Sequence, residues 1–227
     1  MTIPSKNRSH SADEMVATQI IARNIKDQLI TTVFQRIPRH LFVGANEQSL
    51  AYEDQPLPIG YGQTISQPYI VALMIAVMQI DRSARVLEIG TGSGYETAIL
   101  AHLAGEIYTI ERIRALSLRA QKVLAGLGLM NITYQIGNGC LGWPEYAPFS
   151  HIIVTAASAE IPPALTEQIA LGGKLLIPLG APDSSQELTL IEKTPLGLKS
   201  SPILPVRFVP LIDNDTFSNK PQQNSGD

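Results

Sequence analysis

The clearest pattern in the chain is the alternation of short apolar runs with helix-like stretches after residue 81. The apolar runs of strand length are RVLEI, EIYTIE, ITYQIG, HIIVTA and KLLIPLG. Residues 95–104, 114–127 and 162–171 lie between such runs and carry apolar side chains at helical spacing. Because this alternation is typical of α/β proteins, we predict a doubly wound, mostly parallel sheet with helices on both faces. The later runs ELTLIEK and VRFVPL are expected to add antiparallel strands.

The first third of the chain shows a different pattern. Apolar residues from about 13 to 36 recur at helical spacing, and the proline of RIPRHLF ends that predicted helix. Residues 51–69 contain so many prolines and glycines that we expect a long ordered loop or a small cap. The apolar run YIVALMIAVMQI at 69–80 has 12 residues, whereas a membrane-spanning helix needs about 20. We therefore predict a buried helix in this run.

Length and composition are consistent with one domain. The 227 residues are 44% hydrophobic and only 6% aromatic, so the core must consist mainly of Ile, Leu, Val and Ala, as in layered α/β proteins. We predict a single domain over 1–212, with a helical and loop cap at about 13–80 and a Rossmann-like core at about 81–212. The polar residues 213–227 are expected to be disordered.

Charge and cysteine content restrict the partners and the compartment. With 17 basic and 20 acidic residues the net charge is −3, so no positive field is available to hold nucleic acid or an anionic membrane. The single Cys140 cannot form an internal disulfide, and the polar N-terminus lacks the pattern of a signal peptide. The four histidines have no metal-ligand spacing. We expect a cytoplasmic protein without a metal ion, nucleic-acid partner or membrane partner.

A glycine-rich bend follows the first strand of the alternating series. The stretch VLEIGTGSGYETAILA places Gly90, Gly92 and Gly94 at alternate positions before a predicted helix. Glycine permits positive φ angles and a close approach of a ligand to the backbone. In an open α/β sheet, a bend at this place binds a nucleotide-like ligand. The spacing differs from the dinucleotide pattern G-x-G-x-x-G, and no Gly-Lys-Ser or Gly-Lys-Thr follows, which excludes a phosphate-binding P-loop.

Two acidic residues indicate which nucleoside would bind there. Glu88, just before the bend, would repel a pyrophosphate and would favour a ligand with ammonium and sulfonium charge, as in S-adenosylmethionine. Glu111 ends the next strand about twenty residues later, where a carboxylate can accept hydrogen bonds from ribose hydroxyls. A dinucleotide and S-adenosylmethionine both have such hydroxyls, so Glu111 does not distinguish between these two ligands. The alternative is a tight strand-to-helix turn with two solvated glutamates.

Several longer stretches resemble one enzyme family. YEDQPLPIGYGQTISQPYIVALM, VLEIGTGSGYETAILA, FSHIIVTAASAEIPPALTEQIALGGKLLIPLG and VRFVPL are similar to the protein-L-isoaspartate (D-aspartate) O-methyltransferases, from about residue 15 to about 212. The resemblance implies a class I methyltransferase fold and one catalytic domain. It also implies transfer of a methyl group from S-adenosylmethionine to the free carboxylate of isoaspartyl or D-aspartyl residues in damaged proteins and peptides. The product nucleoside is then S-adenosylhomocysteine, and the methyl ester starts repair.

The resemblance also implies site residues. Ser66 of the T-I-S motif would be catalytic, beside the methyl donor and the substrate carboxylate. The expected donor-binding residues are Gln63, Thr64, Ile65, Glu88, Gly90, Gly92, Ser93, Gly94, Glu111, Asn138 and Gly139. Ser66, Thr155 and Ala156 are expected on the substrate side. A carboxylate is already ionised at pH 7, so the enzyme needs to orient it and exclude water, without a general base. A structural role in which Ser66 or Thr64 caps the helix that begins near Pro68 is compatible with this catalytic role.

Three positions depart from the family pattern. Asn138 stands where an acid commonly accepts a hydrogen bond from the adenine amine, and a neutral acceptor is weaker by ~1 kcal/mol. Ser150 replaces a common aspartate, and Glu96 stands where glutamine is frequent. We therefore keep two alternatives to a monomeric isoaspartyl methyltransferase: a methyltransferase for another acceptor, such as a small acid or an RNA base, and a weakly active or non-catalytic module that binds the donor.

Overall fold

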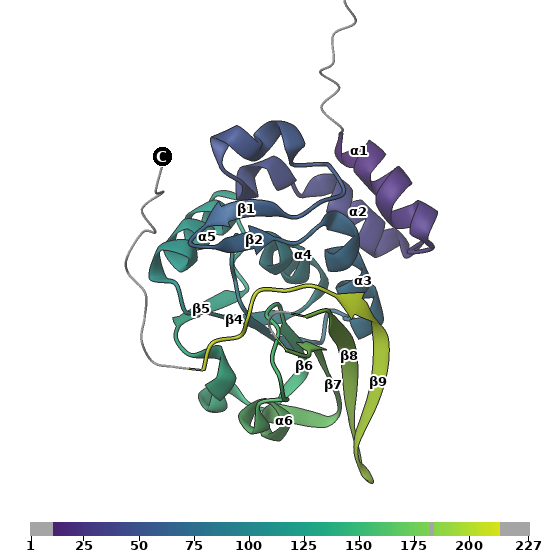
Figure 1. Ribbon diagram of the computed structural model, residues 1–227, viewed down its shortest axis with the longest axis vertical. Coiled ribbons are helices and arrows are strands. Elements are labelled where there is room, and N and C mark those ends of the chain that lie inside the picture. The colour runs from purple at the N-terminus through teal and green to yellow at the C-terminus, as the bar shows by residue number, and fades with distance from the viewer. Residues whose placement is uncertain (1–10, 182–183, 214–227) are drawn as a thin grey trace, which may run out of the picture.

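The computed structural model describes residues 11–181 and 184–213, and Figure 1 shows their arrangement. The N-terminal part contains α1 (Ala12–Met15), α2 (Gln28–Arg36), β1 (Leu57–Gly60), β2 (Gln63–Ile65) and α3 (Pro68–Met78). The expected disorder of 213–227 falls outside the described residues, except for Asp213.

The predicted helix at 13–36 is interrupted in the structure. α1 continues through short π and 3₁₀ turns to Arg23, and the chain then leaves the helix because Asn24 has a φ of 70°. Asp27 starts α2 anew, since its carboxylate accepts hydrogen bonds from the amides of Leu29 and Ile30 at 2.8 and 3.0 Å. The spacing of apolar residues predicted one helix over this range, whereas the structure has helical turns on either side of a break at 24–27.

The centre of the molecule is a seven-stranded sheet. Its strands are β3 (Arg85–Ile89), β4 (Glu106–Glu111), β5 (Ile132–Ile136), β6 (Phe149–Val154), β7 (Ile169–Leu179), β8 (Gln186–Thr194) and β9 (Gly197–Val206), in the order β5-β4-β3-β6-β7-β8-β9. β3 to β7 pair in parallel, and β8 and β9 add antiparallel. This is the predicted α/β fold with a mostly parallel sheet.

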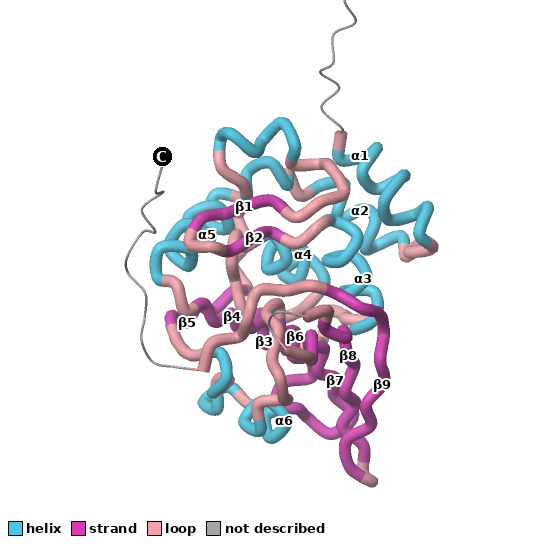
Figure 2. The backbone as a smooth tube through the Cα atoms, in the orientation of Figure 1, coloured by secondary structure: helices cyan, strands magenta, loops and turns pink. Residues whose placement is uncertain are grey.

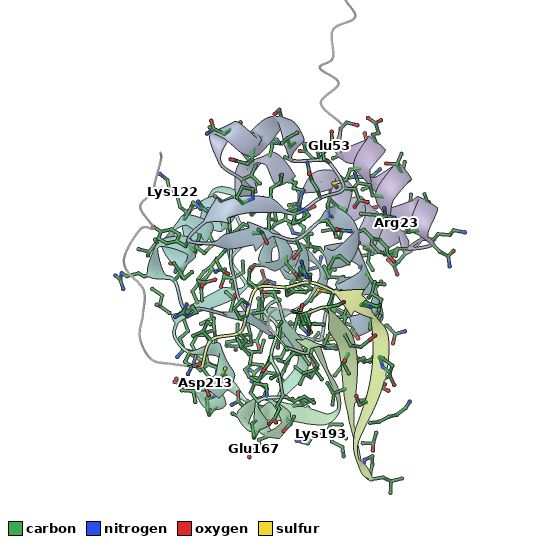
Figure 3. The ribbon with its side chains drawn as sticks, in the orientation of Figure 1. Arg23, Glu53, Lys122, Glu167, Lys193 and Asp213 are labelled. Atoms are coloured by element: carbon green, nitrogen blue, oxygen red, sulfur yellow. The ribbon has the colours of Figure 1, made fainter. Side chains whose placement is uncertain are left out.

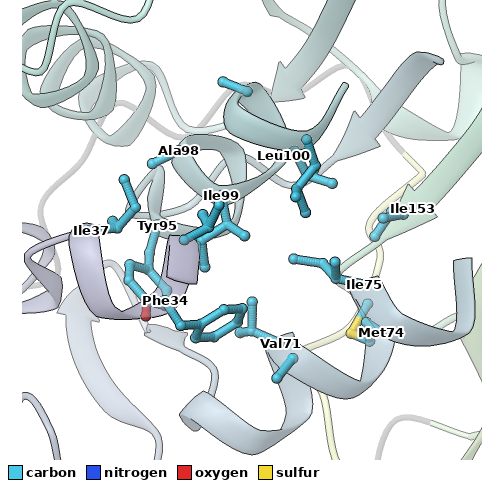
Figure 4. Close-up of a cluster of buried hydrophobic side chains, with 14 of the residues drawn as sticks. Phe34, Ile37, Val71, Met74, Ile75, Tyr95, Ala98, Ile99, Leu100 and Ile153 are labelled. Atoms are coloured by element: carbon cyan, nitrogen blue, oxygen red, sulfur yellow. The ribbon is translucent and has the colours of Figure 1, made fainter. Parts of the chain in front are cut away.

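Apolar side chains on the two faces of the sheet belong to two separate cores. Val86 packs in the larger core with α2, α3, α4 (Tyr95–Leu103) and α5 (Arg114–Gly126). Its neighbour Leu87 points the other way, into a smaller core that includes Leu165 of α6 (Pro163–Gln168). Figure 4 shows Phe34, Tyr95 and Ile99 within the larger core. Helices therefore cover both faces, and the longer ones cover the face that carries the cap.

The segment expected to be a loop or small cap is ordered around a β-hairpin. β1 and β2 pair antiparallel above the sheet, over the start of α4 and beside α5 (Figure 1). The Arg119 guanidinium of α5 donates to the Ile59 carbonyl at 2.7 Å, which fixes the hairpin to the core. The hairpin is therefore held above the glycine-rich bend, at the carboxyl edge of the parallel strands.

The last predicted strand is wrong in position. The edge strand β9 ends at Val206, so most of VRFVPL lies after it, in a loop that Figure 2 shows crossing the carboxyl edge of the sheet. Pro202 and Pro205 obscured the strand in the sequence because proline cannot donate to a ladder, but an edge strand tolerates it. Ala157 pairs with the crossing segment through bonds to Val209 and Leu211, both 2.7 Å long.

Within 11–181 and 184–213, no helix combines the length and the apolar character that a membrane crossing requires.

Candidate functional site

A cavity opens at the carboxyl edge of the parallel strands, between the hairpin and the crossing segment. It is lined by Gln63, Thr64, Ile65, Ser66, Val71, Ile89, Gly90, Thr91, Gly92, Ser93, Tyr95, Glu96, Ile110, Glu111, Arg112, Ile113, Gly139, Thr155, Ala156, Val209, Pro210, Leu211 and Ile212. The structure thus brings together most of the residues predicted for the site. Glu88, Gly94 and Asn138 are the predicted residues outside this lining.

The glycine-rich turn forms one wall of the cavity. Gly90, Gly92 and Gly94 have φ angles of 99°, 53° and 88°. A Cβ atom on Gly90 would lie 2.3 Å from Oγ1 of Thr155, so a side chain at this position would collide with the end of β6. The Thr155 hydroxyl donates toward the carbonyl oxygens of Ile89 and Gly90, at 3.0 and 2.8 Å. Thr155 therefore fixes the turn and lines the cavity.

Gly94 supports the same turn from behind. It is the N-cap residue of α4, and an added Cβ atom would lie 3.0 Å from Cβ of Ala120 on α5. The glycine allows close packing of α4 against α5, which differs from the predicted direct contact with a ligand. The predicted contact of Gly94 with a ligand stays a prediction, since the residue lies outside the cavity lining.

Glu111 is the acidic side chain that was correctly expected at the end of β4. Its Oε2 accepts from the Gly92 amide at 2.8 Å, and its Oε1 accepts from the Ile113 amide at 2.9 Å. Burial raises the pKa of Glu111, and these backbone hydrogen bonds oppose the rise. Each carboxylate oxygen has a second acceptor position, so Glu111 can also receive hydroxyl donors from the cavity.

Glu88 lies behind the turn, not at its mouth as the sequence suggested. The side-chain alternation of β3 places it on the same face as Val86, beneath α4, where it is fully buried. The hydroxyls of Thr97 and Thr109 donate to its Oε2 at 2.6 Å. Burial raises the pKa of Glu88 to about 7, despite these hydrogen bonds. Glu88 therefore supplies no exposed negative charge to the cavity.

Glu96 is a buried acid whose place in the cavity the sequence did not reveal. It follows Tyr95 in the first turn of α4 and lines the cavity, and its Oε1 has no hydrogen-bond partner among the described residues. Burial, and then the charge of Glu88, raise the pKa of Glu96 well above its usual range. A raised pKa favours the protonated carboxyl group, which can donate a hydrogen bond as a glutamine amide does.

Ser66 follows β2 and faces the cavity from the hairpin side. The N-cap residue of α3 is Gln67, and it makes no side-chain capping bond, so the expectation that Ser66 or Thr64 caps this helix is wrong. The Ser66 carbonyl instead accepts a 2.7 Å hydrogen bond from Nη2 of Arg39, a fully buried residue. No sequence motif indicates this contact, which joins residues 27 positions apart.

A second cavity adjoins the first. It is lined by Arg23, Pro56, Thr64, Ser66, Gln67, Tyr69, Ile70, Thr155, Ser185 and residues 204–209. Thr64, Ser66, Thr155 and Val209 line both cavities. Two ligands placed in the two cavities would therefore meet beside the Ser66 and Thr155 side chains. Ala156, the residue after Thr155, lines the first cavity only.

The remaining positions of interest have structural partners. The Ser150 hydroxyl exchanges two 3.0 Å hydrogen bonds with the backbone of Arg85, at the opposite edge of the sheet from the cavity. Its difference from the family pattern therefore leaves the cavity lining unchanged. Among the described residues, no group of three or more His, Cys, Asp or Glu side chains is arranged to hold a metal ion.

A family profile and the sequences of related proteins indicate the same family. The sequence profile described as protein-L-isoaspartate(D-aspartate) O-methyltransferase matches residues 10–216. The chain is 49% identical over 202 residues to the protein-L-isoaspartate O-methyltransferase of Aeromonas hydrophila, covering 89% of this chain and 98% of the relative. It is 46% identical over 208 residues to protein-L-isoaspartate O-methyltransferase 1 of Rhodopseudomonas palustris, covering 91% and 85%.

Two solved structures share the fold over most of the chain. One, a protein-L-isoaspartate O-methyltransferase, has a TM-score of 0.80 at 28% identity, and the match covers 88% of this chain and 65% of that chain. The other, from Plasmodium falciparum, was solved in complex with S-adenosyl-L-homocysteine. Its TM-score is 0.80 at 23% identity, and the match covers 90% of this chain and all of that one.

Proposed function

Because the chain belongs to the protein-L-isoaspartate(D-aspartate) O-methyltransferase family, we propose that its adjoining cavities bind the methyl donor and the isoaspartyl substrate, with Ser66 between them. The enzyme is an S-adenosylmethionine-dependent methyltransferase that acts on isoaspartyl residues of proteins. The observation that carries the assignment of residues is the meeting of the two cavities at Ser66 and Thr155.

The first cavity fits S-adenosylmethionine chemically. Glu111 offers acceptors for the two ribose hydroxyls, and the glycine turn leaves backbone groups accessible at Gly90 and Gly92. Gly139 and Ile89 together form a closely packed wall against which the base can lie, since a Cβ atom on Gly139 would be 2.3 Å from Cγ2 of Ile89. Gln63, Thr64 and Ile65 cover the cavity from the hairpin, and Ser93 lines the turn.

The reaction needs few functional groups from the protein. The bound donor supplies a methyl group on a positively charged sulfur, which is open to attack by a carboxylate oxygen. The substrate carboxylate is ionised at pH 7, so no general base is required. We propose that the Ser66 hydroxyl donates a hydrogen bond to one carboxylate oxygen and directs the other toward the donor. Alignment of this kind contributes about 7 kcal/mol or more in favourable cases.

The second cavity would hold the backbone and flanking side chains of the substrate. Residues 204–209 form one side, and Tyr69 and Arg23 form another, with the Arg23 guanidinium 4.5 Å from the centroid of the Tyr69 ring. Thr155 lines both cavities. We assign Thr155, which follows the end of β6, to the substrate side, whereas the next residue, Ala156, lines only the first cavity and is assigned to the donor side.

We also propose that the protein acts as a monomer in the cytoplasm, with one catalytic domain over 1–212. The cap near 13–80 and the core near 81–212 share the larger apolar core, which supports folding as one unit. The single Cys140 is unpaired, so the fold does not depend on an oxidising compartment. Light scattering at assay concentration tests the monomer.

The test of the proposed function uses purified protein, radiolabelled S-adenosylmethionine and a peptide pair that differs only in an aspartyl or isoaspartyl linkage. Base-labile label should appear on the isoaspartyl peptide alone. Label on neither peptide, with donor binding intact, would instead favour the non-catalytic module. Transfer only to a small acid or to RNA would favour the alternative acceptors.

Replacement of the catalytic serine tests the assignment of residues. We expect Ser66→Ala to lower kcat about tenfold or more while the donor Kd changes less than twofold, because the lost hydrogen bond orients the acceptor. Ser200→Ala, which removes an exposed hydroxyl from β9, is the matched control and should leave both values unchanged. An unaltered kcat in Ser66→Ala contradicts the catalytic assignment.

A further inference from the structure

The Asn138 amide, expected to accept from the adenine amine, is already engaged at both ends. Its Oδ1 accepts from the Cys140 amide at 2.9 Å, which starts the short turn after β5. Its Nδ2 donates to Oδ1 of Asp213 at 2.9 Å. Asn138 itself is outside the lining of the donor cavity, whereas the next residue, Gly139, is part of it. The asparagine therefore offers the cavity little free acceptor capacity.

Asp213 reaches this place from the other end of the chain, 75 positions away. The two residues before it, Leu211 and Ile212, line the donor cavity. The crossing segment is held on the sheet edge by Ala157, through its 2.7 Å hydrogen bonds with Val209 and Leu211. Figure 3 shows Asp213 beyond this segment, on the side of the molecule where β4 and β5 end.

The bond from Asn138 leaves most of the acceptor capacity of Asp213 unused. A carboxylate has about four acceptor positions on its two oxygens, and this bond occupies one of them. A carboxylate is also a stronger acceptor than an amide oxygen. The chain thus has an acid bonded to the residue that precedes Gly139, and this exposed carboxylate follows directly after Ile212 of the cavity lining.

We infer that Asp213 accepts the hydrogen bond from the exocyclic amine of the adenine base in the donor cavity, and that Asn138 is the positioning residue that holds its carboxylate. The inference rests on the proposed function, since it assumes that the base lies against Gly139. A carboxylate at the edge of the base favours a 6-amino purine, which presents a donor, and disfavours a 6-oxo purine, which presents an acceptor.

The experiment measures binding by calorimetry with S-adenosylhomocysteine and S-inosylhomocysteine, which differ in the amino or oxo group at this position. Wild-type protein should prefer the adenosyl compound. We expect Asp213→Asn to weaken adenosyl binding about fivefold, as one charge-assisted bond becomes neutral, and to leave inosyl binding unchanged or tighter. The exchange variant Asn138→Asp/Asp213→Asn should recover most of the preference. Asp13→Asn, with the same change in net charge at an exposed position, is the control.

The two probes separate the possible outcomes. Equal weakening of both ligands in Asp213→Asn would mean that the residue only ties down the crossing segment, and this result overturns the inference. Unchanged binding of both ligands also overturns it. If wild-type protein binds neither nucleoside, the proposed donor site fails instead. Thermal unfolding of each variant verifies that it is folded.

Discussion

At the scale of single residues, burial determines what each acid near the site can do. Glu88 is fully buried, and its pKa is raised to about 7, whereas Glu111 stays at the cavity and is supported by backbone amides. The sequence identified both acids from their distance to the glycines, but it could not show which of them faces the ligand. That difference arises from the alternation of side chains along β3 and the position of α4 above it.

Replacement of Glu88 tests the cost of that burial. Between pH 4.5 and about 7 the folded state binds the Glu88 proton more tightly than the unfolded state, so wild-type stability falls as pH rises through this window and then levels off. Glu88→Gln keeps an acceptor for Thr97 and Thr109 but cannot ionise. Its gain in unfolding free energy over wild type should grow by about 3 kcal/mol from pH 5 to pH 8.

Urea unfolding of both proteins at several pH values measures this gain. Glu187→Gln, which removes an exposed acid from β8, is the matched control and should show no comparable trend. A difference between Glu88→Gln and wild type that does not change with pH contradicts the prediction.

Other residues of the site could not be found from the sequence because their contacts join distant segments. Gly90, Gly92 and Gly139 were predicted from local motifs and line the cavity. Arg39 and Asp213 act on residues 27 and 75 positions away, and only the folded chain brings them together. A motif records short-range geometry, so it contains no information about such pairs.

At the scale of elements, the turn between β3 and α4 is shaped by what lies against it as well as by its backbone angles. Gly60 and Gly90 have similar φ angles of 90° and 99°. Nothing lies within 4 Å of a Cβ atom added to Gly60, whereas one added to Gly90 meets Thr155. A comparison of Gly60 with Gly90 therefore separates the cost of a strained φ angle from the cost of a steric collision.

Alanine at each position tests this separation. We expect Gly60→Ala to lower the free energy of unfolding by about 1–3 kcal/mol, from the strained φ angle alone. Gly90→Ala should cost about 2 kcal/mol more, since Thr155 must move and lose its bonds to Ile89 and Gly90. Denaturant unfolding compares the variants, and equal costs would contradict the role given to Thr155.

The sequence predicted elements well where apolar periodicity was unbroken and less well where proline or polar residues intervened. The strands β3, β4 and β6 and the helices α4 and α5 match the apolar runs closely. The edge strand β9 was missed because two prolines fall within it, and its position was assigned to the following loop. That loop forms one wall of the cavity that we propose for the methyl donor.

At the scale of the whole molecule, Arg39 joins the cap to Ser66, the residue that we propose to be catalytic. It is fully buried, and its Nε donates to the Ala51 carbonyl and its Nη2 to the Ser66 carbonyl, both at 2.7 Å. The guanidinium also lies 4.7 Å from the centroid of the Tyr95 ring, at the start of α4. Burial lowers its pKa, but arginine remains charged in proteins. One side chain thus links the cap, the hairpin and the core.

Loss of this link should affect both stability and turnover. We expect Arg39→Met to lower the free energy of unfolding by about 2–4 kcal/mol, because two buried carbonyls lose their donors. It should also lower kcat more than donor affinity, since Ser66 is no longer held. Arg39→Lys should show smaller losses than Arg39→Met, because the ammonium keeps a donor for one of the two carbonyls. It should not reach the wild-type values, since one ammonium cannot span both carbonyls.

Arg36→Met, on the exposed side of α2, is the matched control for this prediction. Chemical unfolding and steady-state kinetics on the same samples give the two readouts. If Arg39→Met turns over isoaspartyl peptide at the wild-type rate, Arg39 does not position Ser66.

The crossing segment has a consequence for biosynthesis. Val209 to Ile212 complete a chamber whose other walls are encoded between residues 63 and 156. A nascent polypeptide on the ribosome therefore has an unfinished compartment until translation passes codon 212 and this stretch emerges from the exit tunnel. A shortened chain that stops before residue 209 would lack this wall, so we expect it to lose affinity for the methyl donor.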